Sequence, residues 1–400
     1  MSDWTAPPIR SGPAIFGKLY GLSVGDYIEI RELIYRKTAL AFLLSAVFYE
    51  STASKHGLHS IRKLIITEGS ARSAFTEAFE KILDINYQPV FRVAKEALLN
   101  LPPEMETALR NLTSLVFKVA DNRALLRRDF AGKVYHAIVG DLAVRKGFAT
   151  FFTSVPAAYL ISHLALLTPN EFWTKTSWEK LDAVQKFRLC DFAEGTGTLL
   201  SAACDAIQYL HIKEALRKEE DVKVDELHKI LMEQVVWGYD ALRFAVHTAA
   251  TTLALRDPGV TLEKMNLYAI PLGKYVTKSG QSRISLGSLE FLGQGAPTTI
   301  LGYLEGNVGG IATGISTIEE KEETRPVPPA FNIVLMNPPF TRATGRGKKV
   351  KKGKKGLFGF ITEPQIRKDL LKKYRSTRDE IRKKLASLAQ NSGAISVLRN

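Results

Sequence analysis

The feature that most constrains the fold is an apolar run that ends in Asn337-Pro338-Pro339-Phe340. The run, residues 331–336, has the length and apolar character of a strand buried on both faces of a parallel sheet. The two prolines end such a strand because neither has a backbone N–H to donate to a neighbouring strand. Asn337 is therefore expected at the carboxyl end of a strand, where open α/β sheets place their ligand crevice.

The side chains at this strand end suit recognition of an amino group on a planar ring. The amide oxygen of Asn337 can accept one hydrogen of an exocyclic amine, and the carbonyl oxygen of Pro338 can accept the other. Phe340 offers a ring on which a flat base can stack. The alternative at this point is an Asn-Pro turn that merely ends a strand.

Composition indicates a soluble globular protein with a polyanionic partner. The length of 400 residues is enough for two or three domains. The formal net charge of +14 favours nucleic acid as that partner. Its only cysteines, Cys190 and Cys204, exclude a disulfide framework and a cysteine-based zinc site, and they predict reduced thiols in a cytoplasmic protein. No signal peptide and no apolar stretch of bilayer length is evident, so no membrane association is expected.

The first third of the chain predicts helices. Apolar residues recur at three- and four-residue spacing over residues 28–50, 61–83 and 90–99, which predicts an all-α domain over residues 1–140. A further helix is expected to begin near Ser154, a plausible N-cap, with Pro156 in its first turn.

The middle of the chain predicts alternating strands and helices. A strand ends at Asp191, and a turn containing Gly195 and Gly197 leads from it into a helix. Glu194 in that turn disfavours a phosphate ligand and favours a cationic or zwitterionic nucleoside. A second strand ends at Asp240, a position whose acid binds ribose hydroxyls in many folds of this class.

Two more strands complete the expected sheet. Residues 282–286 are predicted as the third strand and the run before Asn337 as the fourth. Strands and helices in this alternating order predict an α/β fold with a doubly wound parallel sheet.

These motifs, taken in order, resemble the adenine-specific (N6) DNA methyltransferases of restriction–modification systems. The matching segments are Phe151-Phe152-Thr153-Ser154, Asp191-Phe192-Ala193-Glu194-Gly195-Thr196-Gly197, Asp240 and Asn337-Pro338-Pro339-Phe340. The resemblance covers roughly residues 129–345, and the ordered set is far more specific than any one motif. It implies a Rossmann-like S-adenosylmethionine-dependent methyltransferase sheet over residues 141–345, preceded by the all-α domain.

The resemblance also implies roles for individual residues. S-adenosylmethionine would lie across the strand ends, and the cofactor-binding residues would be Phe152, Thr153, Asp191, Ala193, Gly195, Gly197, Asp240 and Ser288. The catalytic residues would be Asn337, Pro338, Pro339 and Phe340. Asn337 and the carbonyl of Pro338 would hold the target amine of a flipped-out base and Phe340 would stack on that base, with no metal involved. Ser288 stands where the family usually has an acid that contacts the adenine of the cofactor.

Residues 346–400 are expected to form a basic loop followed by a helix over residues 365–389. The candidate DNA-binding residues in and before this loop are Arg342, Arg346, Lys348, Lys349, Lys351 and Lys352. The alternative is a charged loop with no partner.

The chain stops near the point where a fifth strand should begin, which predicts that a second polypeptide completes the sheet and the target-recognition region. A cognate restriction endonuclease is a further expected partner. The same motif chemistry also serves methyltransferases acting on cytosine N4, RNA bases or protein glutamine amides. An inactive cofactor- or DNA-binding fragment is the non-enzymatic alternative.

Overall fold

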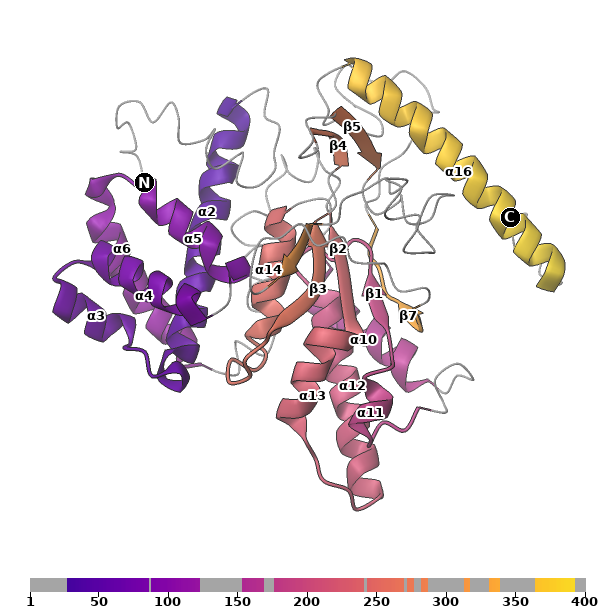
Figure 1. Cartoon of the computed structure of the whole chain (residues 1–400), viewed down its shortest axis with the longest axis horizontal. Coiled ribbons are helices and arrows are strands. Elements are labelled where there is room, and N and C mark those ends of the chain that lie inside the picture. The colour runs from indigo at the N-terminus through magenta and orange to yellow at the C-terminus, as the bar shows by residue number, and fades with distance from the viewer. Residues whose placement is uncertain are drawn as a thin grey trace.

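A computed structural model of the chain shows a mostly helical molecule built around a small, mostly parallel β-sheet (Figure 1). The structure describes residues 27–85, 88–122, 153–168, 176–240, 243–269, 272–276, 282–286, 313–316, 331–338 and 364–392. The N-terminal helices lie at one end of the long axis, the sheet with its helices lies in the middle, and one long C-terminal helix lies at the other end.

Among the residues that the structure describes, five α-helices lie in the N-terminal part, which the sequence predicted to be helical. They are α2 (Tyr27–Thr52), α3 (Ile61–Glu68), α4 (Ala71–Ile85), α5 (Gln88–Leu99) and α6 (Glu106–Ala120). The segment expected as one helical stretch over residues 61–83 is two helices. Gly69 adopts a left-handed φ of 73° and caps the end of α3, which a residue with a side chain does at a cost.

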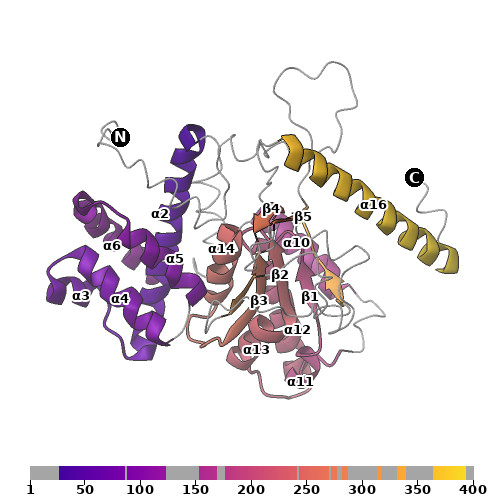
Figure 2. The same cartoon turned by 45° about the horizontal axis from the view of Figure 1, so that its top comes forward.

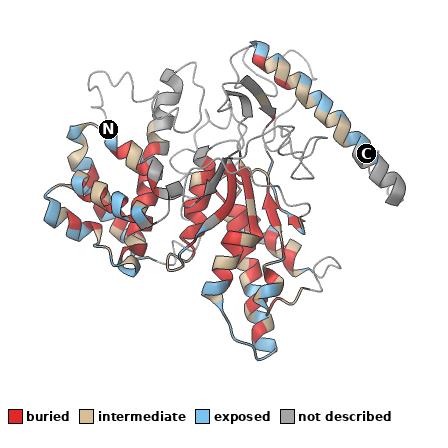
Figure 3. Cartoon of the chain, in the orientation of Figure 1, coloured by how far each residue is buried: buried red, intermediate tan, exposed pale blue. Residues whose placement is uncertain are grey.

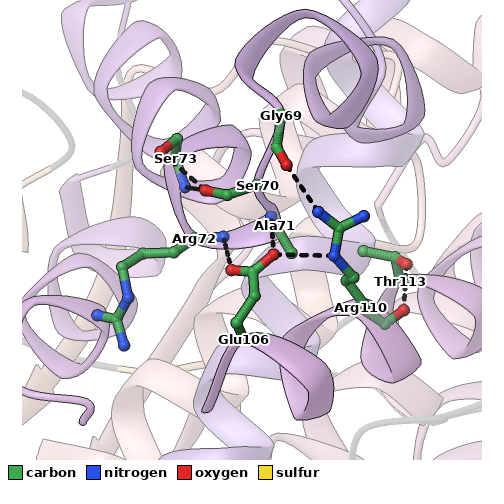
Figure 4. Close-up of polar contacts among 8 residues, drawn as sticks. All are labelled: Gly69, Ser70, Ala71, Arg72, Ser73, Glu106, Arg110 and Thr113. Carbon is green, nitrogen blue, oxygen red and sulfur yellow. Dashed lines mark hydrogen bonds and ion pairs between the residues drawn. The ribbon is translucent and has the colours of Figure 1, made fainter. Parts of the chain in front are cut away.

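One carboxylate joins α6 to the start of α4 (Figure 4). Glu106 accepts the backbone N–H groups of Ala71 at 2.6 Å and Arg72 at 3.0 Å, which have no acceptor within α4. Arg110 donates from Nε to the same carboxylate at 3.0 Å and from Nη2 to the carbonyl oxygen of Gly69 at 2.7 Å. The negative charge of Glu106 therefore lies at the positive end of the α4 dipole and links the starts of α4 and α6.

In the described part of the chain, the central sheet has five strands in the order β6-β3-β2-β1-β7. The strands are β1 (Leu189–Asp191), β2 (Val236–Asp240), β3 (Lys264–Ala269), β6 (Thr313–Ser316) and β7 (Ile333–Val334). The neighbours β3, β2, β1 and β7 are parallel, and β6 pairs antiparallel with β3. The α/β class predicted from the sequence is confirmed.

The strand predicted over residues 282–286 is present, but its predicted place as the third strand of the parallel sheet is wrong. Residues 282–286 form β5 (Ser282–Leu286), which pairs with β4 (Leu272–Val276) in a separate antiparallel hairpin, and β3 takes the third place in the parallel sheet. The apolar pattern of β3 is broken by Asn266, which is nevertheless buried because its amide donates to the carbonyl oxygen of Glu233 at 2.9 Å. That long-range bond has no signature in the local sequence.

Helices cover the sheet and connect its strands (Figure 2). They are α10 (Val155–Leu167), α11 (Leu181–Val184), α12 (Thr198–Arg217), α13 (Val224–Ile230) and α14 (Arg243–Ala254), with one π-helical turn at Leu231–Val235. Ser154 occupies the N-cap position of α10 as expected, although its side chain donates or accepts no capping bond.

The N-terminal helices and the sheet share one hydrophobic core. Buried side chains of α2, α4, α5 and α6 belong to the same continuous cluster as those of α12, α14 and the strands. Helix α14 lies between the sheet and α2 (Figures 1 and 2). Figure 3 shows the buried residues concentrated in this shared interior, whereas α16 (Pro364–Ser392) is mostly half-buried or exposed. Helix α16 corresponds to the basic helix expected over residues 365–389, which is present.

Candidate functional site at the strand ends

The carboxyl ends of β1, β2 and β7 meet at one edge of the sheet. Asp191, the last residue of β1, is in register with Gly238, two residues before the end of β2 at Asp240. On the other side of β1, the backbone N–H of Leu335 donates to the carbonyl oxygen of Cys190 at 2.9 Å. This bond places Asn337, two residues further on, beside the end of β1.

A direct hydrogen bond joins two of the predicted motifs. Nδ2 of Asn337 donates to Oγ1 of Thr153 at 3.0 Å, across 184 positions of sequence. Both side chains are half-buried, and Pro338 beside them is exposed. The amide of Asn337 is therefore held through its NH₂ group by Thr153, two residues before the start of α10.

The turn after β1 is built on two glycines with left-handed backbone angles. Gly195 has a φ of 55° and Gly197 a φ of 79°. A Cβ atom at position 197 would also come within 3.1 Å of the Cβ of Ala249 in α14. Both the backbone conformation and the limited space therefore favour glycine here.

The same turn is tied to the end of β2. The backbone N–H of Gly195 donates to Oδ2 of Asp240 at 3.1 Å, and that of Glu194 donates to the carbonyl oxygen of Tyr239 at 3.0 Å. Ala193, half-buried in the turn, donates its backbone N–H to Oδ1 of Asp191 at 2.8 Å. Five of the predicted cofactor residues therefore lie together in this turn and at the two strand ends that it joins: Asp191, Ala193, Gly195, Gly197 and Asp240.

Two carboxyl groups of this region are deeply buried. Asp191 is 1% exposed, and burial, together with the nearby charge of Asp240, raises its pKa to about 8. Glu194 is 4% exposed, and burial followed by the charges of Asp240 and Asp191 raises its pKa well above its ordinary value. Both oxygens of Glu194 lack a hydrogen-bond partner in the described part of the chain. A positive charge placed beside these carboxyl groups would lower both pKa values again and be stabilised by them, whereas a phosphate would raise both pKa values further.

A buried network positions the helix that follows Thr153. Arg256, just after α14, donates to Oδ1 of Asp205 at 2.5 Å and to the carbonyl oxygen and hydroxyl of Ser201 at 2.9 and 3.0 Å. The hydroxyl of Tyr159 in α10 donates to the other oxygen of Asp205. This network joins α10 and α12 to Arg256, just after α14.

Sequence reasoning missed this network and also missed the burial of Glu194. The only signal for Arg256 was a cationic residue at the end of an otherwise apolar helix, which is ordinarily an exposed position. Nothing in the local sequence distinguishes Glu194 from an exposed turn residue.

The remaining predicted site residues lie outside the described part of the chain. They are Phe152, Ser288, Pro339, Phe340, Arg342, Arg346, Lys348, Lys349, Lys351 and Lys352. Their expected roles remain predictions.

The described residues contain neither a candidate metal cluster nor a helix that could cross a membrane. No group of three or more His, Cys, Asp or Glu side chains among them is arranged to hold a metal ion. None of the described helices combines the length and apolar character that crossing a bilayer requires. Comparison of the sequence with models of known protein families and with curated proteins found no match.

Proposed function

We propose that this protein is an S-adenosylmethionine-dependent methyltransferase that modifies the exocyclic N6 of adenine in DNA. The observation that carries the proposal is the hydrogen bond from Asn337 to Thr153 at the carboxyl end of β7. Two motifs that were linked only by resemblance thus lie in contact, beside the glycine turn and Asp240. A Rossmann-like methyltransferase sheet would bring together the same set of residues.

The chemistry of the strand ends fits the proposed cofactor. Asp240, half-buried at the end of β2, would accept the ribose hydroxyls, and the left-handed turn at Gly195 and Gly197 would allow a ligand to approach the backbone. The buried carboxyl of Glu194, with neither oxygen hydrogen-bonded in the described structure, favours a ligand that carries positive charge. When bound, S-adenosylmethionine supplies a methyl group on a positively charged sulfur, which a neutral amine can attack.

The residues of the chain act on the amine by positioning it. The NH₂ group of Asn337 donates to Thr153, and the amide oxygen of Asn337 is the atom that would accept a hydrogen of the adenine amine. The carbonyl oxygen of Pro338 would accept the second hydrogen, and both bonds would direct the nitrogen lone pair toward the methyl group. Catalysis then comes from proximity and orientation, with the amine proton passing to solvent. Phe340 would stack on the flipped base.

The edge of the sheet supports the proposal of a second polypeptide. Among the described strands, β7 pairs with β1 alone, and its apolar side chains Val334 and, just beyond it, Met336 are 46% and 45% exposed. An apolar sheet edge of this kind is ordinarily covered. A partner chain that adds a strand here would cover it and would bring further DNA contacts; the cognate restriction endonuclease is proposed as a separate partner.

The test is methyl transfer from labelled S-adenosylmethionine to unmethylated DNA. The chain is assayed alone and with the product of the adjacent reading frame, and each assay compares wild type with Asn337→Ala and with Asn111→Ala, an exposed asparagine of α6. We expect label on adenine N6, a loss of about 100-fold or more in Asn337→Ala, and no loss in Asn111→Ala.

Three results would contradict parts of the proposal. Transfer that is independent of Asn337 would remove the proposed catalytic residue. Label on cytosine N4 or only on RNA would replace the substrate. Cofactor binding without any transfer, alone or with the second chain, would identify a binding protein that has no methyltransferase activity.

A further inference from the structure

Helix α16 carries a continuous basic face that the proposed site does not include. The helix contains nine Lys or Arg residues and three Asp or Glu residues among its 29 positions. Five of the basic residues, all exposed, share one face because they fall within about 100° of the helix circumference at 3.6 residues per turn. They are Lys368, Lys372, Arg375, Arg382 and Lys383.

The acidic residues of α16 do not neutralise this face. Asp369 lies toward the side of the helix and accepts the amide of Gln365 at 3.0 and 3.2 Å. Asp379 lies on the face itself, but its carboxylate is bound by Arg378 at 2.8 and 3.0 Å. Glu380 lies off the face and accepts the hydroxyl of Ser376 at 3.4 Å. None of the five basic residues forms an ion pair within the part of the chain that the structure describes.

The opposite face of α16 packs against the β4–β5 hairpin. Ile366 and Leu370 are buried against Leu286 of β5, with Leu371 and Tyr374 partly buried around them. Lys373 donates from Nζ to the carbonyl oxygen of Ile284 at 2.8 Å. The basic face is therefore turned away from the hairpin as a consequence of this packing.

The hairpin carries α16 at the same edge of the sheet as the proposed site. Ala269, the last residue of β3, is in register with Asp240, so β3 ends level with the carboxyl end of β2. Strand β4 begins three residues later at Leu272, and three residues of chain span at most about 11 Å. Figures 1 and 2 both show α16 beside the hairpin and far from α3, α4 and α6.

We propose that α16 is a duplex-DNA-binding arm whose basic face lies along the phosphate backbone next to the proposed site. The face extends over about 15 residues, which is about 22 Å at 1.5 Å per residue, and charges of duplex DNA recur about every 1.7 Å along its axis. Lysine and arginine on an exposed helix face bind phosphates without reading sequence, so the arm supplies affinity and orientation while sequence is read elsewhere. The choice of duplex DNA as the partner rests on the proposed function.

The experiment compares two variants of the full chain with equal loss of charge. In the arm variant the five residues become glutamine (Lys368→Gln, Lys372→Gln, Arg375→Gln, Arg382→Gln and Lys383→Gln). In the control variant five exposed lysines elsewhere become glutamine (Lys63→Gln, Lys118→Gln, Lys180→Gln, Lys186→Gln and Lys213→Gln). All ten side chains are exposed, and thermal unfolding verifies that both variants fold.

Binding of a fluorescent duplex of about 20 base pairs, roughly two helical turns, is measured by anisotropy over a range of salt concentrations. We expect the arm variant to bind about tenfold more weakly, or weaker still, at low salt. We also expect its plot of log affinity against log salt to become shallower by about 0.9 for each phosphate that is no longer neutralised, which is up to about 4.5 for five phosphates. The control variant should retain the affinity and the slope of wild type.

Equal weakening in both variants would overturn the inference, because net charge alone would then explain binding. Binding to anionic vesicles that depends on the same five residues, with no duplex binding by wild type, would overturn it in favour of a membrane surface. The assay contains no cofactor and is independent of methyl transfer. Arm-dependent duplex binding without any transfer would contradict only the proposed function, and Asn337-dependent transfer with unchanged binding in the arm variant would contradict only this inference.

Discussion

The carboxyl group of Glu194 lies directly against the backbone of Gly238 in β2. A Cβ atom built at position 238 would come within 1.8 Å of Oε2 of Glu194 and within 2.8 Å of Cδ2 of Leu267. The turn after β1 can therefore dock onto the sheet only because β2 has no side chain at this position.

This packing predicts the cost of Gly238→Ala. Overpacking between the buried Glu194 and Leu267 should lower the free energy of unfolding by about 1–3 kcal/mol in urea denaturation. Gly259→Ala is the matched control, since its Cβ would meet chiefly the end of the Lys55 side chain, which is exposed and can move. Equal stability of Gly238→Ala and wild type would show that the turn docks differently.

Gly197→Ala should lower the free energy of unfolding more than Gly69→Ala, which changes another glycine with a left-handed φ. The change combines a φ of 79° with a Cβ distance of 3.1 Å to Ala249, whereas Gly69 has a φ of 73° and open space around its Cβ position. We expect a loss of about 1 kcal/mol for Gly69→Ala from backbone strain and a distinctly larger loss for Gly197→Ala. Equal losses in thermal unfolding would remove the packing argument.

The buried carboxyl of Asp191 predicts a pH-dependent stability. Its pKa in the folded chain is raised to about 8 from an ordinary value near 4, so the folded state binds more protons than the unfolded state between these pH values. The free energy of unfolding contributed by this group is present below about pH 4 and is lost as the pH rises through about 8.

Asp191→Asn should flatten that dependence. Asparagine keeps an oxygen for the backbone N–H of Ala193, so the bond at 2.8 Å can be retained without a titrating group. Urea denaturation from about pH 5 to about pH 9 would measure the slope across the raised pKa, with Asp182→Asn on the exposed side of α11 as the control. An unchanged slope in Asp191→Asn would assign the pH dependence to other groups.

Arg256→Met should destabilise the chain strongly. The substitution leaves Asp205 without its buried partner, and removing one member of such a pair costs about 3 kcal/mol or more. Arg217→Met, which removes the exposed ion pair with Glu214, should cost less than about 1 kcal/mol. Calorimetric unfolding distinguishes the two, and similar small losses would mean that Arg256 does not hold α10 in place.

Thr153→Val tests the link between the two motifs, on the basis of the proposed function. Valine keeps the shape of threonine but removes the hydroxyl that accepts the amide of Asn337, so kcat for methyl transfer should fall about tenfold while stability changes little. Thr153→Ser should restore kcat, and Thr168→Val at the exposed end of α10 should leave it unchanged. A fall in Thr153→Val that serine does not restore would indicate a packing effect.

Local sequence was sufficient to predict most elements around the site. The strands that end at Asp191 and Asp240, the glycine turn and the helices after each strand all follow from short-range patterns of apolar residues, glycines and prolines. These patterns are local because a helix repeats its buried positions every three to four residues. A strand buried on both faces gives a short continuous apolar run.

Strand pairing was decided by the tertiary structure. Ser282–Leu286 was a good strand candidate and is a strand, but its apolar side chains pack on α16 and it pairs in a hairpin, while β3 enters the parallel sheet. Which strand joins a sheet depends on residues far away in sequence, such as Glu233, whose carbonyl oxygen satisfies the buried Asn266.

The sequence by itself determined the α/β class, the residue types at the strand ends and the position of Asn337 after a strand. Only the tertiary structure decided that Asn337 contacts Thr153, that Glu194 is buried over Gly238 and that Arg256 holds α10 in place. The physical reason is that hydrogen bonds and burial between distant segments depend on packing distances, which no local periodicity encodes.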